Sequence, residues 1–386
     1  SASGVRSRGS GDMMSADRPR RPERVVHMNS QRAWILAALG VAASVPLVRA
    51  QCGDWTRFTL PQPSTEDYFG AAVAIDGATG VVGAPFADEM GADSGSATLF
   101  DALTGTLTLK LTPQDGFPGN LFGSSVAISG DRVLIGAPYE DSAGTGVNGD
   151  QGDGAQDSGA AYVFVREGES WRQEAYLKAP DTEQDDLFAS DVAISGDIAT
   201  VAAPWNQSVY VYRLVGARWR REAQLRPQAT LHVGFGNRVD VDGDTIAVGQ
   251  SYGPGSVQLF RRDAGAWNWE AEVMAGNGDW YDAFGWSLAL QTDRLLVGAF
   301  REDGAGVGAG SGDDDGAQDS GAAYVFQRAG GSWSEARYLK ASNTDPGDQF
   351  GASVALSGET VVVSANAEES GAIGVDGDQT DNSLAQ

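Results

Sequence analysis

Hydrophobic and polar residues alternate along most of this chain in short runs separated by glycine-rich turns. In one representative segment the runs cover residues 125–128, 132–135, 160–165 and 171–177. Tight turns at Ser129-Gly130-Asp131 and Glu167-Gly168-Glu169 join the first two runs and the last two, and an acidic loop joins the middle two. Alternation with a period of two, interrupted by glycine turns, predicts four short antiparallel strands.

The same unit recurs along the chain. Six landmarks resemble a Phe-Gly pair, and they are Phe69-Gly70, Phe122-Gly123, Phe188-Ala189, Phe235-Gly236, Phe284-Gly285 and Phe350-Gly351. About fourteen residues after each pair comes a second landmark, which reads Gly-Ala-Pro at residues 83–85 and 136–138 and decays in later units. The twelve residues 153–164 recur unchanged at 315–326. No segment after residue 50 has sustained helical periodicity.

Four strands repeated about every 50 residues predict an all-β propeller of four-stranded blades. A β-sandwich or a β-helix is the structural alternative. Six Phe-Gly landmarks indicate six or seven blades, and the sixth unit stops at Gln386 before its third strand. A tryptophan opens the fourth strand of most units, and residues 55–60 form an orphan fourth strand suited to closing the ring. We therefore expect residues 51–386 to form a propeller that is truncated at its C-terminus.

The N-terminal 50 residues differ from the rest of the chain. Residues 1–27 are rich in arginine and proline and are interpreted as upstream, non-structural sequence. Residues 28–50 have Arg32, an apolar stretch and the small-residue end Val48-Arg49-Ala50, which predicts a cleaved signal peptide. The mature protein is then expected to be secreted, periplasmic or on the cell surface, with no membrane insertion. Cys52, the single cysteine, excludes an intrachain disulfide and is interpreted as a spectator thiol rather than a lipidation site.

Composition restricts the function. The formal net charge is −25, which disfavours nucleic acid and anionic membranes and favours cations or basic partners. Beyond residue 50 the only histidine is His232, and serines such as Ser125 lie in repeated strands without a histidine and acid to activate them. We predict no catalytic residues and no organic cofactor.

The ordered landmarks resemble the FG-GAP repeats of the integrin α-subunit propeller and its bacterial relatives. The resemblance extends from Trp55 to the C-terminus. It implies a seven-bladed propeller, often calcium-bearing, that presents loops to extracellular protein or glycan partners. The expected function is therefore non-catalytic binding or adhesion. Two alternatives stay open: an enzyme acting on a glycan or polymer on the same scaffold, and an inert structural surface module.

Acidic loops between the second and third strands are the candidate metal sites. In the fifth unit Ser311, Asp313, Asp315 and Asp319 occupy alternate positions around Gly316, close to the calcium loop of integrin-type propellers. Calcium binds six to eight oxygen ligands, which such a loop can supply. Weaker versions use Asp153 and Asp157 with Asn148 and Asp150 displaced by one residue, and Asp376 with Asp378 in the sixth unit. In integrins the calcium loop precedes Gly-Ala-Pro, whereas here it follows, so solvated acidic loops are the alternative.

A second set of acidic residues precedes the Phe-Gly pairs. Its members are Glu66 and Asp67, Asp181 with Asp185 and Asp186, Asp279 with Asp282, and Asp345 with Asp348. Short acidic side chains at such positions accept hydrogen bonds from nearby backbone amides. We expect them to cap the crossings between blades rather than to bind a ligand.

Overall fold

The computed structural model describes residues 66–114, 116–228, 234–308 and 315–370, and these belong to one compact unit, Leu36–Gln386. The described residues form twenty-two strands and no helix. They therefore contain no helix long and apolar enough to cross a membrane. The upstream segment, the signal peptide and the closing strand at residues 55–60 all lie outside the described residues, and so do residues 371–386.

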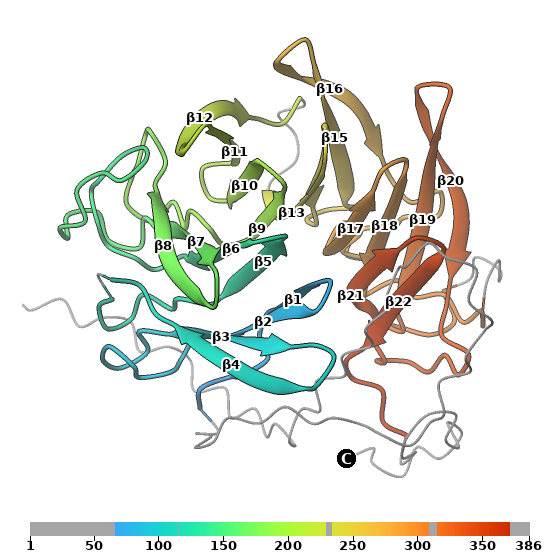
Figure 1. Cartoon of the computed structure of the whole chain (residues 1–386). Coiled ribbons are helices and arrows are strands. Elements are labelled where there is room, and N and C mark those ends of the chain that lie inside the picture. The colour runs from blue at the N-terminus through green and yellow to red at the C-terminus, as the bar shows by residue number, and fades with distance from the viewer. Residues whose placement is uncertain (1–65, 115, 229–233, 309–314, 371–386) are drawn as a thin grey trace, which may run out of the picture. The chain divides into compact units, whose positions relative to one another are not determined.

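The described strands form five four-stranded sheets and one two-stranded sheet, each antiparallel and each built in chain order (Figure 1). Blade one contains β1 Val73–Asp76, β2 Thr79–Ala84, β3 Ser96–Asp101 and β4 Thr106–Leu111; blade two contains β5 Ser125–Ser129, β6 Arg132–Ala137, β7 Ala160–Glu167 and β8 Ser170–Leu177. Blade three contains β9 Val192–Ser195, β10 Ile198–Ala203, β11 Ser208–Val215 and β12 Arg218–Leu225; blade four contains β13 Phe235–Asp242, β14 Thr245–Gln250, β15 Ser256–Asp263 and β16 Ala266–Val273. Blade five contains β17 Ser287–Gln291, β18 Arg294–Ala299, β19 Ala322–Ala329 and β20 Ser332–Leu339; the sixth sheet contains β21 Phe350–Ser357 and β22 Thr360–Ala365.

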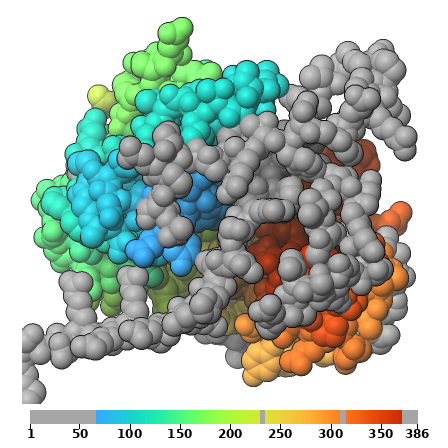
Figure 2. Space-filling model, turned by 90° about the horizontal axis from the view of Figure 1, so that it is seen from below, coloured from blue at the N-terminus to red at the C-terminus, as the bar shows by residue number. Residues whose placement is uncertain are grey.

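The first strands of successive blades contact one another, β1 with β5, β5 with β9, β9 with β13, β13 with β17 and β17 with β21. These inner strands lie toward the centre in Figure 1, and the fourth strands lie at the periphery. Figure 2 shows blades one and two in blue and green on one side and blades five and six in orange and red on the other. The prediction of an all-β propeller is confirmed, and the strand pattern read from residues 125–177 matches β5 to β8.

In four landmarks the Phe is fully buried in the core between two blades, namely Phe122, Phe188, Phe235 and Phe284. Phe188 is fully buried and shares a cluster with Leu134 and Val163 of blade two and Tyr210 of blade three. Phe122 packs edge-on against Tyr162, with ring centroids 5.3 Å apart, and Phe284 repeats this contact with Tyr324 at 5.3 Å. Burying a whole aromatic ring contributes about 2–3 kcal/mol per site. The repeated Phe is therefore what holds neighbouring sheets together.

A glycine just before the third strand allows close backbone packing between blades. Gly159 has a φ of +80°, and a Cβ on it would lie 2.0 Å from the carbonyl oxygen of Phe188 in the next blade. Equivalent contacts join Gly95 to Phe122, Gly255 to Phe284 and Gly321 to Phe350. No side chain fits there, which explains the repeated Ser-Gly-Ala-Ala sequence.

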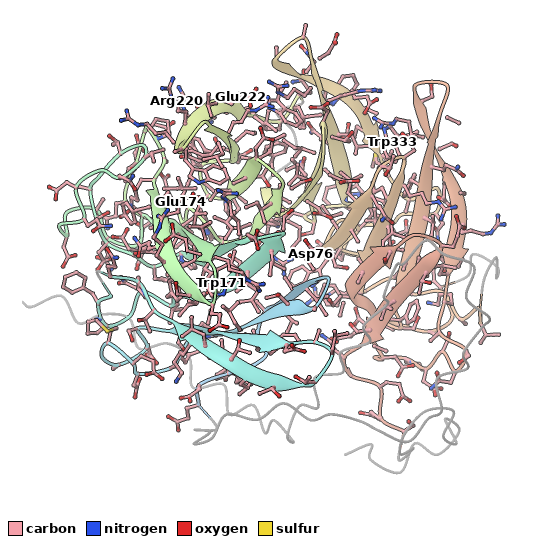
Figure 3. The ribbon with its side chains drawn as sticks, in the orientation of Figure 1. Asp76, Trp171, Glu174, Arg220, Glu222 and Trp333 are labelled. Carbon is pink, nitrogen blue, oxygen red and sulfur yellow. The ribbon has the colours of Figure 1, made fainter. Side chains whose placement is uncertain are left out.

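A tryptophan lies near the start of the fourth strand in several blades, as Trp171 and Trp333 do in Figure 3, and two of these tryptophans hydrogen bond to the fourth strand of the preceding blade. Trp219 Nε1 donates to Glu174 Oε2 at 2.8 Å, and Trp333 Nε1 donates to Glu270 Oε2 at 3.2 Å. Burial alone would raise the pKa of Glu174, but hydrogen bonds from Arg132 and Trp219 lower it below its ordinary value. The tryptophan repeat is thus a structural contact between blades.

The turns between first and second strands are linked in the same direction. A side chain at the end of each first strand accepts a hydrogen bond from a backbone amide in the next blade. The five pairs are Asp76 with Gly130 (2.6 Å), Ser129 with Gly196 (3.0 Å), Ser195 with Gly243 (3.1 Å), Asp242 with Thr292 (2.7 Å) and Gln291 with Gly358 (2.6 Å). Every junction between the six described sheets has this contact, so it fixes the spacing of the inner strands.

Candidate functional site

The loops between second and third strands emerge at the same edge of the blades as the crossings to the next blade, because strands alternate in direction within each sheet. The two kinds of connection hydrogen bond to each other. Leu187 N donates to Asp157 O at 3.1 Å, and Gln349 N repeats the bond to Asp319 O at 3.1 Å. We call this side of the propeller the loop edge. It carries those predicted metal ligands that lie within the described residues.

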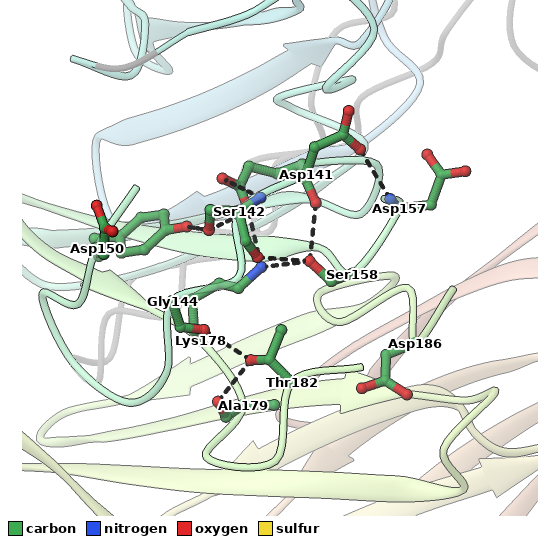
Figure 4. Close-up of polar contacts among 12 residues, drawn as sticks. Asp141, Ser142, Gly144, Asp150, Asp157, Ser158, Lys178, Ala179, Thr182 and Asp186 are labelled. Atoms are coloured by element: carbon green, nitrogen blue, oxygen red, sulfur yellow. Dashed lines mark hydrogen bonds and ion pairs between the residues drawn. The ribbon is translucent and has the colours of Figure 1, made fainter. Parts of the chain in front are cut away.

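Asp157 and Asp319 lie at equivalent points of blades two and five, each with a left-handed backbone at φ of 53° and 52°. The amide of Asp157 donates to Asp141 Oδ1 at 2.8 Å, and the amide of Asp319 donates to Asp303 Oδ1 at 2.7 Å. Figure 4 shows the first of these contacts. Sequence reasoning missed both partner acids, although each stands four residues after the Ala of the second landmark in its own blade.

The other blade-two candidates have different local roles. Asn148 pairs with the backbone of β8 in two ways. Its backbone N donates to Tyr176 O at 2.8 Å, and its side-chain Oδ1 accepts from Tyr176 N at 2.9 Å. Asp150 Oδ1 accepts from Gly152 N at 3.2 Å within its own turn, and the backbone of Asp153 forms an isolated antiparallel β-bridge with the backbone of Ser142. In Figure 4 Asp150 lies on the far side of Ser142 from Asp157. The structure therefore separates Asn148 and Asp150 from Asp157.

In blade five only part of the predicted site is described. Asp315 and Asp319 are within the described residues, whereas Ser311 and Asp313 are outside them, as are Asp376 and Asp378. Across the described ranges, no group of three or more His, Cys, Asp or Glu side chains is arranged to hold a metal ion. Calcium at the full blade-five loop stays a prediction.

A buried charged cluster lies beneath each of these two loops. Lys178 Nζ lies 2.9 Å from Glu140 Oε2 and 2.7 Å from Ser158 Oγ, and the Lys178 and Glu140 side chains are 0% and 3% exposed. Tyr176 also hydrogen bonds to Ser142, which in turn bonds to Glu140. Burial lowers the pKa of Lys178, and the Glu140 carboxylate opposes that change. The spacing of charged residues along the sequence did not indicate this cluster.

Blade five repeats the cluster. Lys340 Nζ lies 2.8 Å from Glu302 Oε2 and 2.7 Å from Ser320 Oγ, with side-chain exposures of 0% and 4% for Lys340 and Glu302. Tyr338 donates to Glu302 Oε1 at 2.8 Å. Both charges of each pair are thus satisfied by one another and by hydroxyl groups, as buried ions require.

Blade one has neither charge at the equivalent positions. Gly95 N donates to Ala87 O as Gly159 N donates to Glu140 O, so Ala87 occupies the position of the glutamate. Thr112 follows Leu111 as Lys178 follows Leu177. The lysine and glutamate are therefore present together in blades two and five and absent together in blade one. That covariation between repeats was the available sequence signal.

The Ser–Lys contact invites a catalytic interpretation, because serine and lysine form the nucleophile and base of some hydrolases. Ser158 is 1% exposed and Lys178 is 0% exposed. Ser158 Oγ also bonds to the carbonyl oxygens of Glu140 and Ser142 at 3.2 and 2.9 Å. No substrate reaches these atoms in the folded protein. The cluster can support the loop edge from below, but it cannot act on a bound molecule.

The acidic residues before the Phe-Gly pairs have the capping role expected of them. Asp186 accepts from Glu183 N at 2.9 Å, Asp282 from Asp279 N at 2.8 Å, and Asp348 from Asp345 N at 2.8 Å. All three side chains are buried, and burial raises the pKa of Asp282 to about 6. This prediction is confirmed for these three crossings.

Exposed aromatic side chains gather on the loop edge. Trp205, Tyr252, Trp280 and Tyr281 are 73%, 57%, 71% and 74% exposed, and each lies in a loop or a crossing at this edge. Trp286 on the same crossing as Trp280 is also exposed, as are Tyr68 and Phe117 on other crossings. Among the described residues, Trp269 on β16 is the strongly exposed aromatic that lies elsewhere. Sequence reasoning did not single out these residues.

Comparison with known families agrees with the repeat pattern. The FG-GAP repeat model matches residues 55–100, 106–164, 171–212, 267–326 and 333–381, which together make up well over half of the chain. The part between the third and fourth matches includes most of blade four, where the landmarks decay. A search of curated proteins found no match. The chain belongs to the FG-GAP repeat family.

Proposed function

We propose that this propeller is an exported, non-catalytic binding protein that holds an extracellular protein or glycan on its loop edge. FG-GAP repeats form propeller modules that are often used for binding. The observation that carries the proposal is the concentration of exposed Trp, Tyr and Phe side chains on this edge. Large exposed aromatic groups mark interaction sites, because leaving them in water forfeits the free energy of burial.

Two further features support binding over the alternatives. An enzyme acting on a polymer needs reactive groups open to solvent, whereas the Ser–Lys–Glu clusters are sealed beneath the loops. An inert structural module would have no reason to expose Trp280 and Tyr281 by more than 70%. Export follows from the signal sequence predicted at residues 28–50. Cleavage there places Gln51 at or near the mature N-terminus, which intact-mass measurement of the secreted protein checks.

The loop edge is tested against the opposite edge of the blades. The purified chain is immobilised, and binding of neutral oligosaccharides, acidic oligosaccharides and oligo-lysine is measured. A loop-edge variant, Trp280→Ala/Tyr281→Ala, is compared with Leu103→Ser/Val215→Ser, which alters two exposed residues on the other side. We expect the first variant to lose binding and the second to retain it. No binding to any probe, or loss only in the second variant, would contradict the proposal.

A further inference from the structure

We propose that blades four and five form a binding site for a neutral oligosaccharide on the loop edge, centred on Arg238, Trp280, Tyr281 and Trp286. This inference rests on the proposed binding function and names its ligand class. It starts from the repeats themselves, because equivalent positions in the six units show which residues the fold requires. A residue that departs from its equivalents in one sector is free to serve a ligand there.

Three positions depart from the repeat in blades four and five. The residue after Phe-Gly is small or polar except at Trp286, and the series is Ala71, Ser124, Ser190, Asn237, Trp286 and Ala352. The next position is a cation only at Arg238, in the series Ala72, Ser125, Asp191, Arg238, Ser287 and Ser353. The third residue of the second landmark is aromatic only at Phe300, in the series Pro85, Pro138, Pro204, Ser251, Phe300 and Asn366.

The departing residues touch one another. The Arg238 guanidinium lies 5.3 Å from the centroid of the Trp286 ring. Trp286 in turn lies 4.8 Å from Phe300, centroid to centroid, and Arg301 lies 5.1 Å from the Phe300 ring. Cation–π contacts of this kind hold the planar groups in fixed orientations. The result is a stacked row that runs from the first strand of blade four to the loop after β18 of blade five.

A second aromatic pair adjoins this row along the same crossing. Trp280 packs on Gly253, where an added Cβ would meet its ring at 3.6 Å, and Tyr281 N donates to Gly253 O at 3.1 Å. The crossing continues to Trp286, and Arg301 N donates to Asp282 O at 3.2 Å. The two aromatic groups therefore belong to one hydrogen-bonded surface. Its flat rings are exposed, while the backbone that carries them is fixed.

The chemistry of this surface fits a sugar. The C–H face of a pyranose ring packs on an exposed indole or phenol ring, which offers an apolar face with a polar edge. The Arg238 guanidinium beside the rings can donate hydrogen bonds to sugar hydroxyls, and the hydroxyl of the exposed Tyr281 can both donate and accept them. Aromatic walls with a few oriented polar groups are typical of small-molecule sites.

Charge selects a neutral ligand. The chain has a formal net charge of −25, which repels polyanions at long range. A cationic ligand would meet Arg238 and Arg301 at the centre of the surface, neither of which has a carboxylate within 4.0 Å in an ion pair among the described residues. An uncharged, hydroxyl-rich ligand is repelled neither by the net negative charge of the protein nor by the two arginines.

The test is a titration of the purified chain with neutral hexaoses of glucose, mannose and N-acetylglucosamine, followed by tryptophan fluorescence and calorimetry. At least one hexaose should bind, and Trp280→Ala/Tyr281→Ala should weaken it about tenfold or more, as loss of central aromatic anchors does. Trp269→Ala is the matched control, because Trp269 is 46% exposed but lies on β16. Trp269→Ala should bind the hexaose as tightly as the wild type does. Arg238→Met serves as an independent variant of the same site. Near-ultraviolet circular dichroism checks that each variant is folded.

The outcomes separate this inference from the proposed function. If no hexaose binds but oligo-lysine or an acidic hexaose does, the inference is overturned and the loop edge still binds. If a hexaose binds equally well to wild type and the double variant, the site is misplaced and the inference is overturned. If nothing in the wider panel binds, both the inference and the proposed function are wrong.

Discussion

The buried Lys178–Glu140 pair allows a sharp prediction about stability. Replacing Lys178 by Thr removes the cation but leaves the Glu140 carboxylate 3% exposed and facing Ser142. Breaking a buried ion pair by removing one partner typically costs about 3–5 kcal/mol, because the remaining charge stays desolvated. We expect Lys178→Thr and Glu140→Ala each to lower the free energy of unfolding by that amount. Urea denaturation measures it through the midpoint and the slope.

Blade one supplies the matched control for this experiment. The double variant Glu140→Ala/Lys178→Thr copies the residues that stand at these positions in blade one, Ala87 and Thr112. With both charges gone no ion is stranded, so the double variant should be more stable than either single variant. Strict additivity of the two single effects, or a loss below about 1 kcal/mol for each single variant, would refute the argument that the pair acts as a unit.

Three further predictions concern single features. Gly159→Ala should destabilise the protein by about 3 kcal/mol or more, because the new Cβ would clash with Phe188 O. Gly168 has a similar φ but nothing within 4 Å of its Cβ position, so Gly168→Ala should cost only about 1 kcal/mol. Equal urea midpoints for the two variants would show that the contact with Phe188 is unimportant. Burial raises the pKa of Asp282 from 3.8 to about 6, so the folded state binds the proton more tightly than the unfolded state. This contribution to stability, about 3 kcal/mol, is fully present below pH 3.8 and is lost as the pH rises through 6. Asp282→Asn should remove that pH dependence relative to wild type, and parallel stability curves between pH 4 and 7 would argue against it. Calcium should raise the melting temperature of wild type but not of Asp313→Ala/Asp315→Ala, and equal heats in a calorimetric titration would leave the blade-five loop a solvated surface feature.

The sequence allowed the blades to be predicted because the fold repeats its requirements. Phenylalanine recurs at the position of Phe188 because its ring fills the core at a junction between blades. Glycine recurs at the position of Gly159 because a Cβ there would clash with the backbone of the next blade. Alternation along β5 to β8 was readable because one face of each strand packs on its neighbour. Features that depend on how distant loops meet were less accessible.

Two cases show why the site was harder to predict than the fold. The spacing of oxygen-bearing residues grouped Asn148 with Asp157, yet the loop folds back so that Asn148 pairs with the edge of β8. Spacing along the chain does not determine the direction of a long loop. Lys178 and Glu140 are 38 residues apart, and only a comparison between repeats reveals that they vary together.

The most direct test of the account is amide hydrogen exchange of the purified chain with and without the best-binding probe from the panel. A ligand on the loop edge should slow exchange in residues 250–254 and 274–286, which carry Tyr252, Trp280 and Tyr281. The turns between third and fourth strands, such as the one at Gly168, should exchange at the same rate in both samples. Protection confined to those turns, with none at residues 274–286, would contradict binding on the loop edge.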